Sequence, residues 1–148
     1  MVVGFGDYRE PLERMADPER TLFTGPFEHR HLVHLLALAD ACVVPSIFPE
    51  AFGMVAAEAA AGCPPLVARH SGLAEVAEGL EAEYPPPLRH LAAFATGDAA
   101  ELHEKLRELL ALPRGDRAAI SAAARRAAVE RWSWASIAER LLRLGAGG

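Results

Sequence analysis

Residues 41–68 read ACVVPSIFPEAFGMVAAEAAAGCPPLVA, and they carry the clearest secondary-structure signals of the chain. It opens with the apolar run Ala41–Val44, which is typical of a short strand buried in a parallel sheet. Pro45-Ser46 ends that strand, and the Ala-rich segment Gly53–Ala61 is predicted to be a helix that ends at the following glycine. A second apolar run, Leu66–Ala68, is the next predicted strand. A strand, a helix and a strand in this order indicate an α/β protein with a parallel sheet.

The same alternation continues upstream of this stretch. Short apolar or β-branched runs predict strands at Val2–Phe5 and Thr21–Thr24. Between and after them, Arg9–Ala16 and His29–Asp40 are predicted helices, the second with a leucine-rich face. We therefore predict a Rossmann-like parallel sheet flanked by helices.

Downstream of Ala68 the pattern becomes mostly helical. We predict a short helix at Leu73–Glu78, an extended surface segment at Glu81–His90 and a last strand at Phe94–Thr96. A helix begins near Ala99, and one apolar stripe on it comprises Leu102, Leu106, Leu109 and Leu110. Asp116 and Ser133 are candidate N-terminal caps of the last two helices. The final helix carries Trp134, Ile137, Ala138 and Leu141 on one face.

Composition limits the possible functions. The chain has 148 residues, of which 51% are hydrophobic and 24% charged, which is typical of one globular domain. A net charge of −5 without a dense basic cluster argues against nucleic acid as a partner. Two cysteines outside any CxxC pair argue against a disulfide scaffold or structural zinc. The same cysteine usage makes a reducing cytoplasm the expected location. No apolar run is long enough to span a membrane, and the first residues do not resemble a signal peptide.

The segment Pro45–Glu58 concentrates the polar chemistry. It lies at the carboxyl end of a predicted buried strand, where open α/β sheets bind ligands. Glu50 precedes the helix and Glu58 lies within it, while the first-turn amides of Phe52 to Met54 lack intrahelical acceptors. Two carboxylates with amides between them suit a polyhydroxyl ligand such as a sugar and a ribose. On spacing alone, a helix-dipole role for Glu50 and an exposed surface role for Glu58 remain equally open.

Glu50 and Glu58 form an E-x7-E pair within PSIFPEAFGMVAAE. This segment resembles the nucleotide-sugar half of the group 1 (family 4) retaining glycosyltransferases of the GT-B fold. Val3–Asp7 is similar to the family's strand and loop, and Phe23–Phe27 to its base-binding loop. The resemblance covers the chain to about Val76 and returns at 132–142.

The resemblance implies an enzyme that transfers a hexosyl group from a nucleoside diphosphate sugar to an acceptor with retention, without a metal or another cofactor. It implies that Glu50, the expected catalytic residue, binds hydroxyls of the donor sugar, and that Glu58 binds the ribose. The backbone at Gly25–Phe27 would hold the base. The donor-binding residues expected in this way are Gly25, Pro26, Phe27, Ser46, Glu50, Ala51, Phe52, Gly53, Met54, Val55 and Glu58.

The resemblance also implies that residues 1–148 are a donor-binding domain that is incomplete at its N-terminus. The family's basic residues for the diphosphate, a first strand with its helix, and the acceptor-binding domain would all precede Met1. Strands 2–5 and 41–44 would then lack the neighbour between them unless the sheet closes up and pairs them directly. Unpaired apolar edges recruit other chains, so we expect the isolated chain to self-associate and to be inactive as a transferase. Downstream, Leu80–Pro87 replaces the family's glycine-containing turn.

Other functions fit the sequence less well. Gly4-Phe5-Gly6 begins like a dinucleotide fingerprint, but Arg9 stands where its last glycine belongs, and no acidic residue ends the following strand at Thr24 to bind a ribose. Three histidines, His29, His31 and His34, have no carboxylate or cysteine at metal-ligand spacing. We interpret Trp132 and Trp134 as helix-docking residues, and Arg125, Arg126 and Arg131 as a solvated face. A non-catalytic nucleotide- or sugar-binding module, or an assembly domain, remains the alternative.

Overall fold

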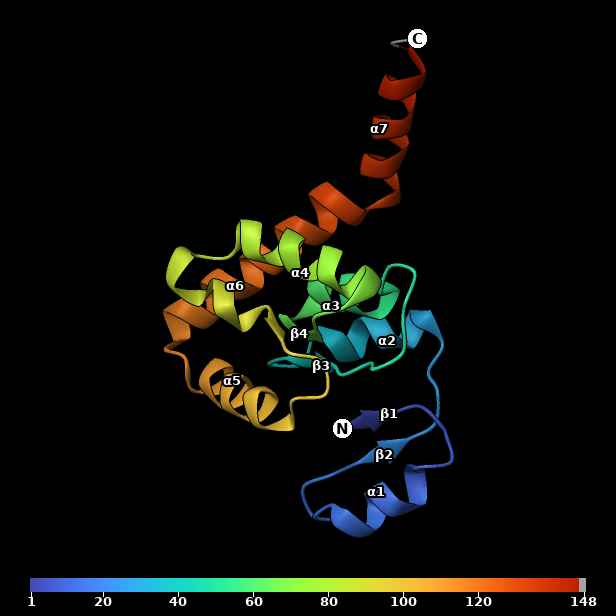
Figure 1. Ribbon diagram of the computed structural model, residues 1–148, viewed down its shortest axis with the longest axis vertical. Coiled ribbons are helices and arrows are strands. Elements are labelled where there is room, and N and C mark those ends of the chain that lie inside the picture. The colour runs from blue at the N-terminus through green and yellow to red at the C-terminus, as the bar shows by residue number, and fades with distance from the viewer. Residues whose placement is uncertain (147–148) are drawn as a thin grey trace. The chain divides into compact units, whose positions relative to one another are not determined.

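The computed structural model describes residues 1–146, which divide into two compact units, 1–34 and 35 onward (Figure 1). In the first unit, β1 (Val2–Val3) and β2 (Phe23–Thr24) form a parallel pair in which Val2 lies opposite Phe23. The crossover between them contains α1 (Arg9–Met15). The helix α2 (His29–Leu36) follows β2 and ends earlier than the predicted Asp40.

The second unit contains a three-stranded parallel sheet in the order β3-β4-β5. Cys42 of β3 lies opposite Pro65 of β4, and Val67 of β4 lies opposite Ala93 of β5. Its elements are β3 (Cys42–Val44), α3 (Met54–Gly62), β4 (Pro65–Ala68), α4 (Ser71–Glu83), the 3-10 helix η1 (Pro86–Leu91), β5 (Ala93–Phe94), α5 (Ala99–Ala111), α6 (Arg114–Ala127), the π-helical turn η2 (Ala128–Trp132) and α7 (Trp134–Ala146). Parallel strands with helices packed against them confirm the predicted α/β class. β1 and β3 belong to separate sheets rather than pairing directly.

Helices cover both faces of the β3-β4-β5 sheet, and successive residues of β4 pack against opposite faces. Val67 packs into a core cluster with residues of α3, α4 and α6. Leu66 and Ala68 instead pack with Phe94 of β5 and with partly buried leucines of α5. Leu66, Val67 and Ala68 are all fully buried, as the uninterrupted apolar run predicts.

Small side chains allow α3 and α6 to pack closely together. Ala56 and Ala59 of α3 and Ala123 and Ala124 of α6 have no exposed surface, and the two helices are in contact. An alanine projects only its Cβ, so facing alanines let two helix backbones approach while still burying apolar surface. The Ala-rich stretch that predicts α3 therefore also determines how α3 packs.

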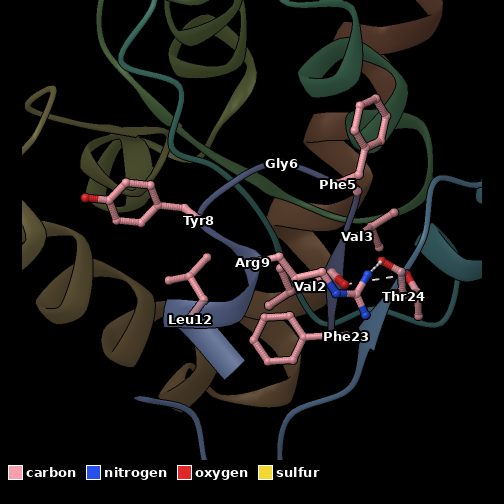
Figure 2. A pocket seen from close by; sticks show the side chains of 10 residues that line it. Val2, Val3, Phe5, Gly6, Tyr8, Arg9, Leu12, Phe23 and Thr24 are labelled. Carbon is pink, nitrogen blue, oxygen red and sulfur yellow. Dashed lines mark hydrogen bonds between the residues drawn. The ribbon is translucent and has the colours of Figure 1, made fainter. Parts of the chain in front are cut away.

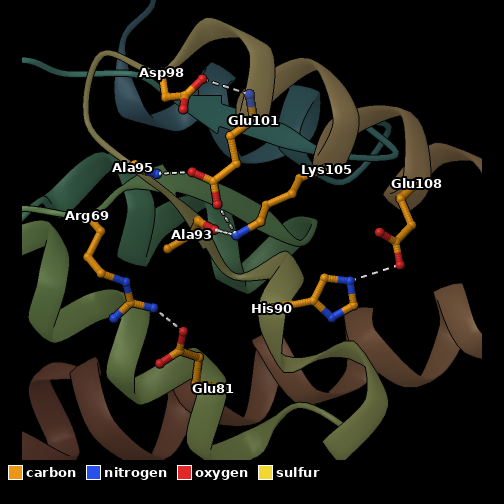
Figure 3. Close-up of polar contacts among 9 residues, drawn as sticks. All are labelled: Arg69, Glu81, His90, Ala93, Ala95, Asp98, Glu101, Lys105 and Glu108. Carbon is orange, nitrogen blue, oxygen red and sulfur yellow. Dashed lines mark hydrogen bonds and ion pairs between the residues drawn. The ribbon is translucent and has the colours of Figure 1, made fainter.

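Polar contacts fix the N-terminus of α5 beside β5 (Figure 3). Asp98 caps the helix, because its carboxylate accepts a hydrogen bond from Glu101 N at 2.9 Å. The Glu101 carboxylate accepts one from Ala95 N at 2.6 Å and pairs with Lys105 at 2.7 Å. The Lys105 hydrogen bond, followed by that from Ala95 N, lowers the pKa of Glu101. Lys105 also donates to Ala93 O, which ties α5 to β5.

The prediction of a short helix followed by an extended surface segment at Glu81–His90 is wrong. α4 continues from Ser71 to Glu83, and η1 follows at Pro86–Leu91. Tyr84, between them, is only 1% exposed, and its burial raises the pKa of the phenol. Arg69, just before α4, forms an ion pair with Glu81 near its end. The buried Tyr84 and Leu91 draw this segment onto the core.

Three expectations for the C-terminal helices need correction. Asp116 does not cap α6; Pro113 is the capping position, and Asp116 lies in the first turn. On α5, Leu109 is buried but Leu110 is 46% exposed, so the leucine stripe is narrower than predicted. On α7, Trp134 and Leu141 are exposed rather than docked, whereas Ser133 does cap this helix by accepting from Ser136 N at 3.1 Å.

The arginines near the end of α6 are not simply a solvated face. Arg131 donates a hydrogen bond to the Glu83 carboxylate at 2.8 Å, and Arg126 lies 3.7 Å from the other oxygen. Arg125 donates to Ala61 O at 3.3 Å. The Arg131 hydrogen bond is the main cause that lowers the pKa of Glu83 below its ordinary 4.5. The Glu83 contacts join the end of α4 to α6 and η2, and the Arg125 contact joins α3 to α6.

Because the folded-state pKa of Glu83 is lowered, its ion pairs stabilise the fold above about pH 4.5, and that contribution is lost as pH falls. We expect Glu83→Gln to reduce the free energy of unfolding by about 1 kcal/mol near pH 7 and to match the wild type near pH 3. Urea denaturation across this range measures the difference. Glu139→Gln, which removes the exposed pair with Arg143, is the matched control and should have little effect. A pH-independent difference would contradict the assignment.

Candidate functional site

The loop after β3 brings Glu50 to the N-terminus of α3. The helix begins at Met54, one residue later than predicted, and Gly53 precedes it with φ +96°. This left-handed conformation favours glycine, and a Cβ at Gly53 would lie 2.5 Å from Leu73 Cδ2, so the leucine side chain would have to shift. The same hypothetical Cβ would lie 3.7 Å from Glu50 Oε2. The half-buried Glu50 carboxylate therefore lies beside the first turn of the helix.

The first turn of α3 can accept a polar ligand. Gly53 O accepts hydrogen bonds from Ala56 N at 3.0 Å and Ala57 N at 3.3 Å. The N–H groups of Met54 and Val55 precede these donors and have no intrahelical acceptor. Both side chains are more than half exposed, so the turn is open to solvent. The positive end of the helix dipole at this turn favours an anionic group.

Three hydrogen bonds clamp the site loop to the turn between β4 and α4, and a fourth lies within the turn. His70 Nε2 lies 2.6 Å from Ser46 O, and because a carbonyl can only accept, the proton is on Nε2. His70 Nδ1 is then an acceptor for the Ser71 hydroxyl at 3.0 Å. Ser71 Oγ in turn accepts from Glu50 N at 3.0 Å, and Gly72 N donates to Glu50 O at 3.0 Å. Both backbone polar groups of Glu50 are therefore fixed.

Ser71 and Gly72 are constrained by this clamp. Ser71 has φ +44°, a left-handed conformation that is costly for a residue with a Cβ. A Cβ at Gly72 would lie 2.3 Å from Phe52 Cα, so the site loop passes directly over this glycine. Neither of these residues, nor His70, was among the predicted site residues. A signal exists, because His70-Ser71-Gly72 follows a buried strand, and neighbouring parallel strands end at one edge of the sheet.

Two substitutions of Ser71 distinguish the contribution of its hydroxyl to stability from the cost of its strained backbone conformation. Ser71→Ala removes the acceptor for Glu50 N–H and keeps the strained conformation, so we expect it to lower the free energy of unfolding by about 1–2 kcal/mol. Ser71→Gly removes the same acceptor but relieves the strain, so its cost should be smaller. Urea denaturation measures both.

Hydrogen exchange at Glu50 N–H supplies the second measurement for Ser71, and we expect faster exchange in both variants. Ser121→Ala, on α6, is the matched control and should leave this amide unchanged. Wild-type exchange at Glu50 in the Ser71 variants would show that the hydroxyl does not hold the loop.

An aromatic contact braces the loop from η2. Phe52 packs edge-to-face on Trp132, with ring centroids 6.3 Å apart and an interplanar angle of 72°. A Cβ at Gly79 would lie 2.6 Å from Trp132 Cζ2, so α4 offers a glycine where the indole packs. The cavity beside this contact has a volume of about 490 Å³. It is lined by Phe52, Glu75, Glu78, Gly79, Arg131, Trp132, Ile137 and Arg140.

The remaining expected site residues divide between the two units. Ser46, Ala51 and the half-buried Glu58 belong to the second unit with Glu50. The expected base-binding residues Gly25, Pro26 and Phe27 follow β2 in the first unit and are exposed. Their assigned roles in donor binding remain predictions.

The first unit contains its own cavity of about 140 Å³ beside the Gly4–Gly6 loop (Figure 2). Its wall comes from β1, β2 and α1, and Arg9 enters it. The Arg9 guanidinium donates to Thr24 O at 3.0 Å and to Glu13 at 2.7 Å, so it holds α1 against β2. A Cβ at Gly4 would meet no atom within 4 Å, and its φ of +127° alone explains the glycine.

Within residues 1–146, no cluster of three or more His, Cys, Asp or Glu side chains is arranged to hold a metal ion. No helix in the same range combines the length and apolar character needed to cross a membrane.

Comparisons with known proteins agree on one family. The family model described as "Glycosyl transferases group 1" matches residues 1–127. The chain is 41% identical over 75 residues to a glycogen synthase of Mycobacterium tuberculosis (strain H37Rv), a match that covers 48% of this chain and 18% of the synthase. Its structure resembles sucrose-phosphate synthase from Thermosynechococcus elongatus with a TM-score of 0.74 and 25% identity over 98% of this chain. The chain spans 37% of that neighbour, and so corresponds to a minor part of either relative.

Proposed function

The chain belongs to the glycosyl transferases group 1 family, and we propose that it is the donor-binding domain of a cytoplasmic enzyme that transfers a hexosyl group from a nucleoside diphosphate sugar with retention. One observation supports this proposal above the others. The Glu50 carboxylate lies beside the open first turn of α3, at the carboxyl end of a parallel sheet. This arrangement offers a hydroxyl acceptor and an anion site side by side.

Each part of the site has a distinct role in the proposal. Glu50 accepts hydrogen bonds from hydroxyls of the donor sugar, and the amides of Phe52 to Val55 support the sugar and the distal phosphate. Glu58 binds the ribose, and the backbone at Gly25–Phe27 holds the base. When the sugar leaves, negative charge accumulates on the diphosphate, and the N-terminus of α3 stabilises that charge. We propose that transfer needs no metal ion and that the rest of the enzyme supplies basic residues and the acceptor site.

The two glutamates should separate sugar recognition from nucleotide recognition. In the complete enzyme, we expect Glu50→Gln to depress transfer strongly while leaving the affinity for the free nucleoside diphosphate nearly unchanged. Glu58→Ala should weaken binding of the nucleoside diphosphate about tenfold or more, with or without the sugar, because it loses a charged hydrogen-bond partner. Titration calorimetry with UDP, GDP, ADP and their sugar conjugates measures both effects.

Glu104→Gln is the matched control, because Glu104 is an exposed glutamate on α5 outside the site. It should leave affinity and transfer at the wild-type level. Equal loss of nucleotide and nucleotide-sugar binding in Glu50→Gln would refute its role in sugar recognition, and an unchanged dissociation constant for the bare nucleotide in Glu58→Ala would refute the ribose assignment. Binding without turnover in the complete protein would favour a non-catalytic module.

The strand edges support the proposal that these residues are part of a larger sheet. Within residues 1–146, β1 pairs only with β2, and β3 only with β4. Val2 and Val3 are each 42% exposed. We propose that a further strand of the complete enzyme pairs with these free edges, which otherwise attract other chains.

The isolated chain should therefore self-associate increasingly as its concentration rises. Light scattering coupled to size-exclusion chromatography measures its mass, and a version extended by the preceding strand and helix should stay monomeric. A monomer at every concentration, with no gain in stability on extension, would contradict the missing-strand proposal.

A further inference from the structure

The two cysteines of the sequence lie next to each other in the fold. Cys42 is the first residue of β3, and Cys63 follows the last residue of α3. The parallel ladder brings their backbones together, because Cys42 N donates to Pro64 O at 3.1 Å and Cys42 lies opposite Pro65. The chain between them contains the site loop and all of α3.

The backbone pairing places the two thiols close enough to influence each other. The side chain of Cys63 lowers the pKa of Cys42, and the side chain of Cys42 raises the pKa of Cys63. Burial also raises the pKa of Cys63, which is only 2% exposed, whereas Cys42 is half-buried. Cys42 is therefore the better nucleophile and the more accessible of the two sulfurs.

From this adjacency we propose that Cys42 and Cys63 are a modification site: a small-molecule disulfide oxidises them to a reversible intramolecular disulfide that closes the β3-loop-α3 segment into a covalent ring. The proposal does not depend on the transferase function. It also differs from a structural disulfide framework, which two cysteines alone do not suggest.

The chemistry balances with one equivalent of oxidant. The Cys42 thiolate attacks one sulfur of the oxidant, forms a mixed disulfide and releases one small thiolate. That thiolate takes up the proton that Cys63 gives up. The Cys63 sulfur then attacks Cys42 Sγ and displaces the second small thiolate. Solvent protonates this second thiolate with the proton that Cys42 lost at the start. Two protein thiols are oxidised, and one disulfide is reduced to two thiols.

The disulfide would change the stability of the fold without contacting the expected ligand-binding residues. The cysteines lie at the amino end of β3 and the carboxyl end of α3, whereas Glu50 and Gly53 lie at the opposite ends of these two elements. Closing the ring therefore touches no expected ligand-binding residue. A loop of about 20 residues loses chain entropy in the unfolded state, so we expect the midpoint of thermal unfolding to rise by about 5–10 °C.

Oxidation of the full chain with glutathione disulfide under native conditions tests the proposal. We expect both thiols to disappear and the protein mass to fall by two hydrogen atoms. An arginine-specific protease leaves both cysteines in residues 31–69, but a glutamate-specific protease separates 29–50 from 59–75. These two peptides should remain linked until a reductant is added. A stable glutathione adduct, a disulfide-linked dimer or two unreacted thiols would overturn the proposal.

A second measurement shows whether the fold promotes closure. The ratio of reduced to oxidised glutathione that reduces the disulfide should be at least about tenfold higher for the native chain than for the chain in denaturant. The reason is that a disulfide that stabilises the fold is itself stabilised by folding. Equal ratios would overturn the proposal. Cys63→Ser should stop at an adduct on Cys42, and Cys42→Ser should react more slowly because Cys63 is buried. Neither variant should gain thermal stability on oxidation.

Discussion

The pairing of β3 with β4 is the constraint on which the candidate site depends. Val44 lies opposite Val67, so the loop after β3 and the turn after β4 leave the sheet at the same edge. From there the turn can reach the loop through His70, Ser71 and Gly72. A shift of register by one residue would break all of these contacts, because the side chains would point to the other face. Both strands are nearly or fully buried at this point, which fixes the register.

The sequence predicted the elements whose signals are local. Continuous apolar runs identified β3 and β4, composition identified α3, and Ser133 was recognisable as a cap because its partner is three residues away. The extent of α4 was not predictable in this way. Gly72 and Gly79 weaken a helix locally, yet each is required by a distant group, Phe52 in one case and Trp132 in the other. The reason for each glycine lies outside any local window.

The candidate site shows the same division. The position of Glu50 beside a helix start follows from the sequence, because a strand, a loop and a helix succeed one another within a short segment. The hydrogen bonds that hold its backbone are harder to predict, because Ser71 belongs to a different strand-helix unit. Ser71 also adopts a left-handed conformation at a position where the sequence has no glycine to indicate it. The adjacency of Cys42 and Cys63 was also hidden, since it arises from ladder geometry and not from a sequence motif.

α4 unites the supports of the site loop. Its first turn supplies Ser71 and Gly72, which hold the backbone of Glu50. Near its middle, Gly79 makes room for Trp132, which packs on Phe52. At its last residue, Glu83 pairs with Arg131, the neighbour of Trp132 in η2. A helix that ended at Glu78, as predicted, would supply only the first of these three supports. The part of α4 after Glu78 therefore supports the site, because it holds η2 in place and, through Trp132, also the Phe52 side chain of the loop.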